Sequence, residues 1–354
     1  MKHLNQYKNL KVIVTGSTGF KGSWLSFWLH HLNAKVVGIS LKPEKNSVIF
    51  NSLNLGKKIK QIYIDITDLK KLDDVFKREK PDIIFHLAAQ SIVSLSYTNP
   101  IKTIMTNVIG STNVLESIKK NRIKNLVYIT SDKCYYNDGR SSSYSEGDIL
   151  GGEDPYSASK ASAELVFKCY LKSYLNYGEK LSFVTTRAGN VIGGGDMKKD
   201  RIVPDIVRSI KNKTPLTIRN PNATRPWQHV LEPLSGYLKL GSLLINKKLS
   251  KSIEPHWNFG PKSSNCKTVN QVAKKIISIW GTNKKINVKA NKKFKESKLL
   301  MLSSSKAKKE LDWQPRLSFN ETIEMTVAWY KSFIDGNNID ILSKEQIEFY
   351  LNKK

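Results

Sequence analysis

The strongest constraint on the fold is a regular alternation of short apolar runs with longer helical patterns along the first half of the chain. The runs are rich in Val, Ile and Leu and show little polar alternation, which is typical of strands buried on both faces of a sheet. Predicted strands cover residues 11–16, 35–40, 62–67, 82–89, 125–131 and 181–189, and predicted helices cover residues 20–32, 102–121 and 157–177. Strands and helices in this order predict an α/β fold with a doubly wound parallel sheet.

Three glycines follow the first predicted strand and open the first predicted helix. Gly16, Gly19 and Gly22 stand in the sequence TGSTGFKGSWL. This spacing allows a tight turn and close approach of a pyrophosphate, and the helix N-terminus offers free N–H groups to the phosphates. A purely structural glycine turn explains the strand–turn–helix context less well. The sequence therefore predicts a Rossmann-type dinucleotide site.

The end of the second predicted strand lacks the acidic residue that usually holds the adenosine ribose. Ser40, Leu41 and Lys42 occupy this place in GISLKP, so the motif leaves NAD and NADP both open. Asp65, at the end of the third predicted strand, is well placed for the adenine amino group, although a helix N-cap is nearly as good an interpretation.

The regular pattern loosens after about residue 195 into helices and short strands. A chain of 354 residues is long enough for one large domain or two. We expect residues 1–190 to form the dinucleotide-binding Rossmann domain, including the catalytic residues, and residues 191–354 to form mainly a smaller substrate-binding lobe. The charged run at residues 291–298 is expected to be a solvated surface segment.

The chain is strongly basic, with 58 Lys and Arg residues against 30 Asp and Glu residues and a net charge of +28. Such a charge can attract nucleic acid or an anionic membrane. Because the excess is spread along the chain, solvated lysines on exposed helices are the favoured interpretation. Neither nucleic acid nor a membrane is therefore expected as a partner, and no metal site is predicted.

The cysteines suggest a reducing compartment. Cys134, Cys169 and Cys266 form no CxxC pair and are odd in number, which favours reduced thiols over a disulfide framework. Neither a signal peptide nor a membrane-spanning segment is predicted. We therefore expect a cytoplasmic protein.

A tyrosine and a lysine lie four residues apart near the start of the last predicted helix. Tyr156 and Lys160, in DPYSASKASAELV, share one face of that helix. A nearby ammonium and a positively charged nicotinamide favour the phenolate, and lowering the pKa of the phenol by ~3 units needs about 4 kcal/mol. With Ser131 to bind the same hydroxyl, the set predicts alcohol oxidation beside a hydride acceptor. The alternative is an exposed Tyr–Lys pair on a helix surface.

The strand at residues 125–131 ends in Ser131, Asp132 and Lys133 rather than in a turn of Gly, Asn or Pro. Sites form at this edge of a doubly wound sheet. A hydroxyl, an acid and a base in succession there indicate further proton transfer. The alternative is that Asp132 and Lys133 only cap the strand.

Five motifs stand in a characteristic order and spacing, namely TGSTGFKGSW, HLAAQ, ITSDK, YSASK and RAGNVIGGGD. Together they resemble the extended short-chain dehydrogenase/reductase family. The longer stretches GFKGSWL, SDKCYYN, GGEDPYSASK and TRPWQHVLEPLSGY are similar to the members of this family that dehydrate CDP-glucose. The resemblance covers nearly the whole chain. It implies an NAD-dependent lyase that converts CDP-glucose to CDP-4-keto-6-deoxyglucose and water, in deoxysugar biosynthesis for lipopolysaccharide O-antigen.

The resemblance also implies which residues bind the ligands. The cofactor-binding residues are Gly16, Thr18, Gly19, Phe20, Gly22, Asp65, Ile66, Ala88, Ala89, Thr106, Tyr156 and Lys160. The substrate-binding residues are Gln90, Ser131, Asn190, Arg201, Arg219 and Arg225. Arginine suits the nucleotide diphosphate because its planar fork binds phosphate oxygens in pairs, although Arg219 is equally well interpreted as a surface charge. A homodimer or homotetramer, paired through helices beside the sheet, is expected.

The implied catalytic residues are Ser131, Asp132, Lys133, Tyr156 and Lys160. Tyr156 takes the C4 hydroxyl proton as hydride passes to NAD, the C5 proton is removed, the C6 hydroxyl leaves as water, and the hydride returns to C6. Asp132 is expected to be the acid at C6. Lys133 stands where related dehydratases carry Glu, and it is expected either to remove the C5 proton or to stabilise the enolate.

Other functions compete with this interpretation. A nucleotide-sugar 4-epimerase also oxidises C4 but needs neither an acid at C6 nor a base at C5, so Asp132 and Lys133 argue against it. A 4,6-dehydratase for another nucleotide-glucose stays open, because the choice of base rests on the resemblance alone. A basic nucleic-acid-binding protein on a retired dehydrogenase scaffold predicts a lost glycine turn or a lost Tyr–Lys pair, and both are intact.

Overall fold

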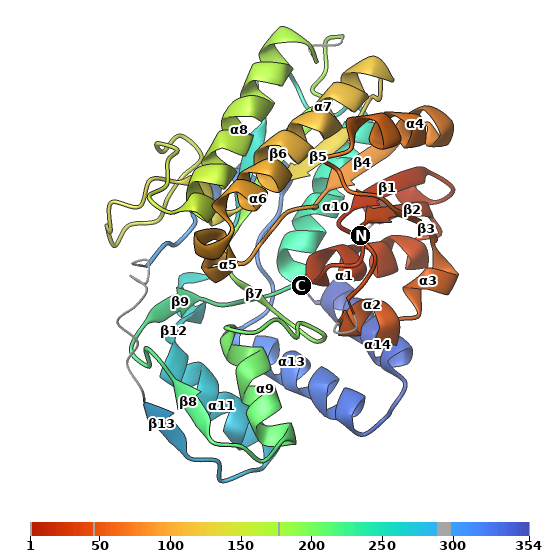
Figure 1. Cartoon of the computed structure of the whole chain (residues 1–354). Coiled ribbons are helices and arrows are strands. Elements are labelled where there is room, and N and C mark those ends of the chain that lie inside the picture. The colour runs from red at the N-terminus through yellow and green to blue at the C-terminus, as the bar shows by residue number, and fades with distance from the viewer. Residues whose placement is uncertain (1, 45–46, 176–177, 289–298, 354) are drawn as a thin grey trace.

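The computed structural model describes residues 2–44, 47–175, 178–288 and 299–353 (Figure 1). The charged run at residues 291–298 lies outside the described residues. Among the helices that are described, none is long and apolar enough to cross a bilayer.

Within the described residues, a seven-stranded sheet forms the centre of the molecule, and its neighbouring strands run parallel. From one edge to the other the strands are β11 (His256–Phe259), β6 (Phe183–Ala188), β5 (Leu126–Ile129), β4 (Ile83–His86), β1 (Lys11–Thr15), β2 (Lys35–Ser40) and β3 (Lys60–Tyr63). The order reverses between β1 and β4, so the predicted doubly wound, Rossmann-type sheet is confirmed.

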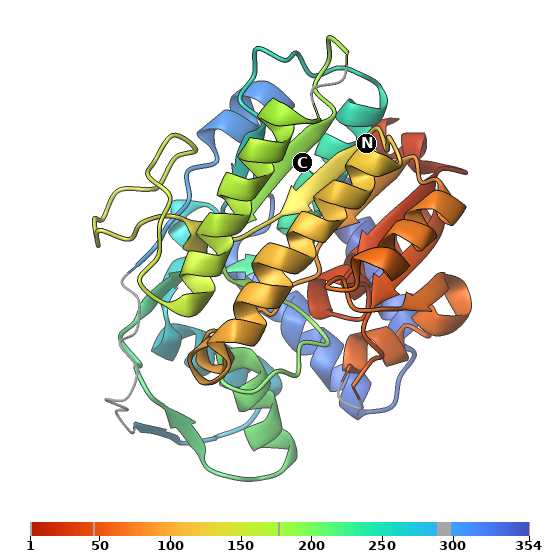
Figure 2. The same cartoon turned by 45° about the horizontal axis from the view of Figure 1, so that its top comes forward.

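Helices cover both faces of this sheet (Figures 1 and 2). They are α1 (Phe20–His31) and α10 (Leu231–Ile245) on one face, and α4 (Leu69–Glu79), α7 (Ser111–Lys120) and α8 (Pro155–Ser173) on the other. Successive strand residues point to opposite faces. Val12 and Val14 therefore pack with α1 and α10, whereas Ile13 packs with α4, α7 and α8. All three residues are fully buried, which explains why the strand runs show no polar alternation.

The helix predicted at residues 102–121 consists of three parts. α6 (Pro100–Ile104) continues into a π-helical segment, η2 (Met105–Gly110), and then into α7. Gly110 lies so close to Ile66 that a Cβ atom on Gly110 would be 2.7 Å from Ile66 Cγ1. The widened turn therefore lies against the loop after β3, and π-turns of this kind are common at functional sites.

The sheet also contains a strand that the sequence pattern did not predict. β11 returns from the second half of the chain to pair with β6, and α10 packs on β5 and β6. The 4 residues of β11 are too few to show a period of their own. The division of the chain after residue 190 stays a prediction.

A second lobe lies beyond the carboxyl edge of the sheet (Figure 1). It includes the paired strands β7 (Val191–Ile192) and β10 (Gln228–His229), β9 (Thr224–Pro226) and β12 (Cys266–Thr268), and β8 (Leu216–Ile218) and β13 (Ile286–Val288), with the helices α9 (Ile202–Lys211), α11 (Val269–Trp280) and α13 (Phe319–Ile334). A Cβ atom on Gly189, at the end of β6, would lie 3.5 Å from Asp132 Oδ2 and 3.9 Å from Pro226 Cγ. The lobe therefore faces the ends of β5 and β6.

The other described elements are short or lie at the periphery. They are η1 (Lys2–Tyr7), α2 (Val48–Ser52), α3 (Leu55–Lys58), α5 (Val93–Thr98), η3 (Asp132–Cys134), η4 (Ser263–Asn265), α12 (Ser305–Leu311) and α14 (Ile339–Asn352).

Candidate active site

The glycine turn after β1 is too closely packed for side chains. Gly16 has a φ of +72°, and a Cβ atom there would lie 2.9 Å from the backbone of Ala88. A Cβ atom on Gly22 would lie 2.1 Å from the Gly16 carbonyl oxygen. Gly19, the N-cap of α1, provides no side-chain cap, so the first N–H groups of the helix remain available to a phosphate. The residues of the turn therefore fit the pyrophosphate of a dinucleotide.

A buried hydrogen-bond network fixes the end of β4 against this turn. Thr15 Oγ1 accepts from the N–H groups of Leu87 and Ala88, both at 3.1 Å, and lies 2.7 Å from His86 Nδ1. His86 Nε2 lies 2.9 Å from Ser111 Oγ. Burial lowers the pKa of His86 to about 3, so the ring is neutral. No motif indicated this network, because a Thr and a His within apolar runs look like ordinary strand residues.

Two hydroxyls and an amide form hydrogen bonds at the end of β2, where dinucleotide-binding sites usually carry an acidic residue. Gln61 Nε2 donates to Ser40 Oγ at 3.0 Å, and Ser17 Oγ donates to Gln61 Oε1 at 2.9 Å. Thr18 Oγ1 donates to the Leu41 carbonyl at 3.4 Å. The ribose end of the predicted cofactor site is therefore polar and uncharged at Ser40.

Asp65 lies in the loop between β3 and α4. Its Oδ1 accepts from the Thr67 N–H at 2.9 Å, whereas α4 is capped by Asp68, which accepts from the Lys71 N–H at 3.1 Å. The interpretation of Asp65 as a helix N-cap is therefore wrong, because the N-cap of α4 is Asp68, three residues later. Ile66, the next predicted cofactor residue, is buried.

The remaining predicted cofactor residues come from three further segments. Phe20 opens α1, and a Cβ atom on Gly193 would lie 3.4 Å from its Cζ. Ala89 follows β4 and Thr106 lies in η2, and both are partly buried. The structure thus draws these residues from α1, η2 and the segment after β4.

The chain turns sharply after β5. Ser131 caps the 3-10 turn η3 by accepting from the Lys133 N–H at 3.3 Å, and its hydroxyl donates to Asp132 Oδ1 at 2.8 Å. Ser131 and Asp132 are buried, whereas Lys133 is partly exposed. The backbone therefore bends at residues 131–133. Such a bend is needed if neighbouring side chains are to reach one ligand.

Helix α8 brings Tyr156 to Ser131. Asp154 caps the helix by accepting from the Tyr156 N–H at 3.0 Å. The buried Tyr156 phenol hydrogen-bonds the Ser131 side chain. Burial raises the pKa of Tyr156 to about 12, the bond to Ser131 opposes this increase, and Asp132 adds to it. Within the protein alone the pKa is raised, because desolvation of the phenol outweighs the bond to Ser131 and the charge of Arg201; the expected decrease also counted on a positively charged nicotinamide.

Lys160 is buried one turn after Tyr156. Burial lowers the pKa of Lys160 to about 8, and Glu164 on the next turn opposes this decrease. Glu164 accepts from Arg187 Nε and Nη2 at 3.0 and 2.9 Å and from Thr185 Oγ1 at 3.0 Å. The buried pair ties α8 to β6 below the candidate site, and no sequence motif indicated it.

Two of the predicted substrate-binding arginines lie at different depths. Arg201, directly before α9, donates to Asp196 at 2.6 Å and acts electrostatically on Tyr156. Arg219 is exposed and pairs with Asp200 at 3.2 Å. Arg201 therefore lies near enough to Tyr156 for its charge to act on the phenol, whereas Arg219 has an acidic partner on the surface.

The other predicted substrate residues lie on three separate segments. Arg225 lies in β9, where its Nη1 donates to the Thr224 carbonyl at 2.9 Å. Asn190 is exposed directly after β6. Gln90 is tied to α6, since its Nε2 donates to Thr103 Oγ1 at 3.0 Å.

Comparison with known proteins shows the family to which this geometry belongs. The family model described as GDP-mannose 4,6 dehydratase matches residues 13–326. The chain belongs to this dehydratase family. It is also 42% identical over 353 residues to the CDP-glucose 4,6-dehydratase of Salmonella typhimurium, with 98% of each chain covered.

Solved structures related to this dehydratase family member have the same fold. The dTDP-glucose 4,6-dehydratase of Bacillus anthracis, solved in complex with NAD, has a TM-score of 0.76 at 25% identity and covers 91% of this chain and 97% of its own. The UDP-glucose 4-epimerase of Thermotoga maritima, solved with UDP-glucose, has a TM-score of 0.79 at 22% identity over 92% and 100%. This second likeness concerns the fold alone. The resemblance to extended short-chain dehydrogenases/reductases is thus confirmed.

In this dehydratase family member, Lys21 interacts electrostatically with residues of the cluster, although no motif had indicated it. Lys21 is the second residue of α1 and is only partly exposed. Its ammonium is attracted by Asp132 and repelled by Lys160 and Arg201. A cation at a helix N-terminus opposes the helix dipole, which is the sequence signal that would have marked Lys21.

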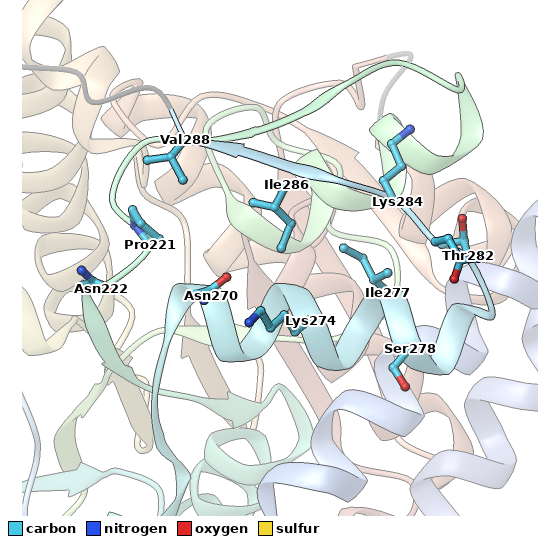
Figure 3. Close-up of a pocket in the computed structure, with 11 residues that line it drawn as sticks. Pro221, Asn222, Asn270, Lys274, Ile277, Ser278, Thr282, Lys284, Ile286 and Val288 are labelled. Atoms are coloured by element: carbon cyan, nitrogen blue, oxygen red, sulfur yellow. The ribbon is translucent and has the colours of Figure 1, made fainter.

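A shallow groove on the second lobe lies between α11 and β13 (Figure 3). Asn270 and Lys274 of α11 and Ile286 of β13 line it. None of the candidate site residues contributes to its lining, so the groove is separate from the candidate active site.

Proposed function

We propose that the protein is an NAD-dependent CDP-glucose 4,6-dehydratase, which converts CDP-glucose to CDP-4-keto-6-deoxyglucose and water. The observation that carries the proposal is the 42% identity with the Salmonella typhimurium CDP-glucose 4,6-dehydratase over 98% of both chains. The cluster of Ser131, Asp132, Tyr156 and Lys160 supports it, because it places a hydroxyl, an acid, a phenol and an amine at one edge of the sheet.

The glycine turn supports NAD as the cofactor. Gly16, Gly19 and Gly22 leave space for the pyrophosphate, and the first N–H groups of α1 are placed to bind it. The bound nicotinamide supplies hydride acceptance from C4 and hydride return to C6. Because Ser40 and Gln61 replace an acid after β2, we test the choice by comparing turnover with NAD and NADP, and we expect NAD to be the better cofactor.

Tyr156 is placed to take the proton of the C4 hydroxyl. Its phenol bonds the Ser131 side chain, so Ser131 is placed to hold the same substrate hydroxyl. Lys160 lies one turn away on the same helix and provides positive charge that stabilises the phenolate as it forms. Because burial raises the pKa of Tyr156 to about 12, the phenol acts as a base only when such positive charge is beside it.

Asp132 is placed to protonate the C6 hydroxyl as it leaves. Its carboxyl group is bonded to Ser131, which marks C4, and it faces Gly189 at the end of β6. Lys133 follows it on η3 and is the predicted base at C5 or stabiliser of the enolate. The arginines of the second lobe, Arg201 and Arg225, are placed to bind the diphosphate of the nucleotide sugar.

The proposal extends to a homodimer or homotetramer formed through helices beside the sheet. Exposed apolar side chains gather on α5, α6, η2 and α8, which contact one another and lie side by side in Figure 2. They are Val93, Leu95, Tyr97, Ile101, Ile104, Met105, Ile109 and Leu165. An apolar surface of this extent is typical of a subunit interface. We place the enzyme in the cytoplasm, in deoxysugar biosynthesis for lipopolysaccharide O-antigen.

The direct test is to incubate the purified protein with NAD and, separately, with CDP-, dTDP-, UDP- and GDP-glucose. We expect CDP-glucose to give a product lighter by one water, with a methyl proton signal at C6. A product of unchanged mass with an inverted C4 centre would identify a 4-epimerase. Dehydration of a different nucleotide-glucose alone would correct the assigned base.

A further inference from the structure

A buried ion pair lies between the two halves of the candidate catalytic cluster. It joins Arg187 of β6 to Glu164 of α8, and both side chains are buried. The guanidinium donates from Nε and Nη2 to the two carboxylate oxygens at 3.0 and 2.9 Å. A fork of this kind fixes direction as well as distance. The pair therefore holds α8 in a defined position against β6.

The same carboxylate also holds the residue that precedes Ser131. Glu164 Oε1 accepts from Thr130 Oγ1, and Glu164 Oε2 accepts from Thr185 Oγ1 at 3.0 Å. Burial acts to raise the pKa of Glu164, but the charge and hydrogen bonds of Arg187 and the bonds of the two threonines lower it below its ordinary value. The carboxylate is therefore ionised near neutral pH and accepts four hydrogen bonds.

The remaining arm of Arg187 reaches the segment that follows η3. Its Nη1 donates to the Tyr135 phenol at 2.7 Å and to the Glu146 carbonyl at 3.3 Å. The Tyr135 phenol in turn donates to Asn258 Oδ1 of β11 at 2.8 Å. The chain around η3 is therefore bonded to the pair on both sides, by Thr130 before the turn and by Tyr135 after it.

The proposed chemistry depends on how α8 and η3 are placed relative to each other. Tyr156 and Lys160 lie on α8, whereas Ser131 and Asp132 lie at η3. The Tyr156 phenol bonds the Ser131 side chain only if the helix and the turn stay in register. A displacement of about 1 Å in such a site can cost about 100-fold in rate. Because the ion pair is bonded to both elements, it helps to set this register.

A role in stability alone does not account for this arrangement. Replacing a buried ion pair with apolar side chains of similar volume is often neutral or stabilising, because both ions lose their hydration on burial. Apolar side chains cannot supply directed contacts to a helix and to both sides of a turn.

We propose that Glu164 and Arg187 are positioning residues for the reaction. Their pair holds η3 against α8, so that Ser131 and Tyr156 meet the same substrate hydroxyl. The inference rests on the proposed 4,6-dehydratase function and adds to it the residues that keep its catalytic groups in place.

Loss of the charge on Glu164 tests the inference. Glu164→Gln keeps the size of the side chain, but its amide group turns a donor toward another donor. At each NAD-binding site we expect C4 oxidation of CDP-glucose to fall by about 10–100-fold, while the KM for CDP-glucose changes little. NADH absorbance in a single turnover measures this rate, and NAD titration counts the sites. A purely structural residue would lower the number of sites and leave the rate at each site unchanged.

Glu79→Gln is the matched control. Glu79 of α4 is a buried carboxylate that accepts from Lys60 Nζ at 2.7 Å and from Arg78 Nε at 2.9 Å. Because Lys60 begins β3, this carboxylate lies at the edge of the sheet opposite the candidate site. We expect the control to oxidise C4 at the wild-type rate per site, even if it is less stable.

Two further variants separate direction from charge and from folding. Arg187→Lys keeps the charge but loses the planar fork, so we expect it to oxidise C4 slowly as well. The double variant Glu164→Met/Arg187→Met keeps a similar combined volume without leaving one ion unpaired. Thr130 and Tyr135 retain hydrogen bonds to other partners in it, so we expect it to fold and still to oxidise C4 slowly.

Amide exchange tests the geometry without any substrate. The N–H groups of Cys134 and Tyr135 donate to the carbonyls of Ser131 and Asp132, both at 3.2 Å. In the variants of the ion pair we expect these amides to exchange with D₂O at least about 10-fold faster, because the turn is no longer held on both sides. Amides of α4 should exchange as in wild type. Mass spectrometry of peptides measures both.

The outcomes separate the inference from the function on which it rests. Wild-type oxidation per site in Glu164→Gln, or in Arg187→Lys, would show that the direction of the pair does not matter and would overturn the inference. Unchanged amide exchange around η3 would overturn it as well. Wild-type protein that does not dehydrate CDP-glucose would refute the proposed function, and the amide exchange would still decide whether the pair holds η3.

Discussion

At the scale of single residues, burial shifts the pKa values of several groups of the candidate site, so that the neutral form of each is favoured. Burial raises the pKa of Tyr156 to about 12 and lowers the pKa values of Lys160 and Lys21 to about 8. Charge is costly for each of them because burial removes its hydration. In the proposed mechanism, the positive charge of the bound NAD would help Tyr156 to give up its proton.

Removing the phenol should separate oxidation from binding. In Tyr156→Phe we expect C4 oxidation to fall by about 10²–10⁴-fold, the usual contribution of a general base, while CDP-glucose affinity changes little. NADH absorbance in a single turnover measures the first quantity and calorimetry measures the second. Retention of most of the turnover would place the proton acceptor elsewhere.

The acid at C6 should control a later step. Asp132→Asn keeps the size of the side chain and its contact with Ser131 but cannot donate a carboxyl proton. We therefore expect C4 oxidation to continue and bound NADH to accumulate, while release of water slows by about 10²-fold or more. Normal dehydration by this variant, measured by product mass, would show that Asp132 is structural.

Single residues were predictable from sequence where a motif has a fixed place in the fold. Gly16, Ser131 and Tyr156 were singled out as candidates because the strand–turn–helix order places them at one edge of a parallel sheet. Lys21 was missed because one lysine among 58 Lys and Arg residues looks like a surface charge until its burial is known. The burial that raises the pKa of Tyr156 in the protein alone could not be read from spacing either.

At the scale of elements, a buried carboxyl group fastens the C-terminal helix to the sheet domain. Glu232 of α10 accepts from the N–H groups of Arg316 and Leu317 at 2.8 and 2.6 Å and from the Tyr350 phenol of α14 at 2.8 Å. Burial raises the pKa of Glu232 to about 7. Glu232 therefore lies on a helix that packs directly on β5 and β6, beneath the candidate site.

This carboxyl group should make stability depend on pH. The folded protein keeps the Glu232 proton up to about pH 7, whereas the unfolded chain releases it near 4.5, so the free energy of unfolding falls as the pH rises through this window. Glu232→Gln imitates the protonated form. We expect it to remove this decrease and to exceed wild type at pH 8 by up to about 3 kcal/mol, at about 1.4 kcal/mol per pKa unit. Urea unfolding at pH 5 and pH 8 measures both, and equal pH dependence in the two proteins would contradict the assignment.

Elements were predictable in proportion to their length and regularity. β1 and β2 were predicted almost to the residue, because each is a β-branched run next to a turn. β3 was placed too late, since its exposed Tyr63 ends the strand before the apolar residues that follow it. The π-helical segment and β11 depend on contacts with distant parts of the chain, which no local pattern contains.

At the scale of the whole molecule, the exposed apolar residues of α5, α6, η2 and α8 predict association. In the double variant Ile101→Glu/Ile109→Glu, two charges would be buried without partners in the proposed interface, so we expect dissociation to monomers. Sedimentation velocity at several concentrations measures the change. Ile149→Glu, at a similarly exposed isoleucine outside these helices, is the matched control and should leave the assembly intact. A wild-type monomer would contradict the proposed oligomer.

The pairing of β11 with β6 has a consequence for biosynthesis. On the ribosome, the edge of β6 remains unpaired until His256–Phe259 has been synthesised, long after β6 itself has emerged. Unpaired strand edges promote aggregation, and pairing over such a sequence separation forms slowly. Nascent chains that stop before β11 should therefore be sensitive to proteases and dependent on chaperones, and the sheet should become resistant only when the chain that builds the second lobe has closed back onto it.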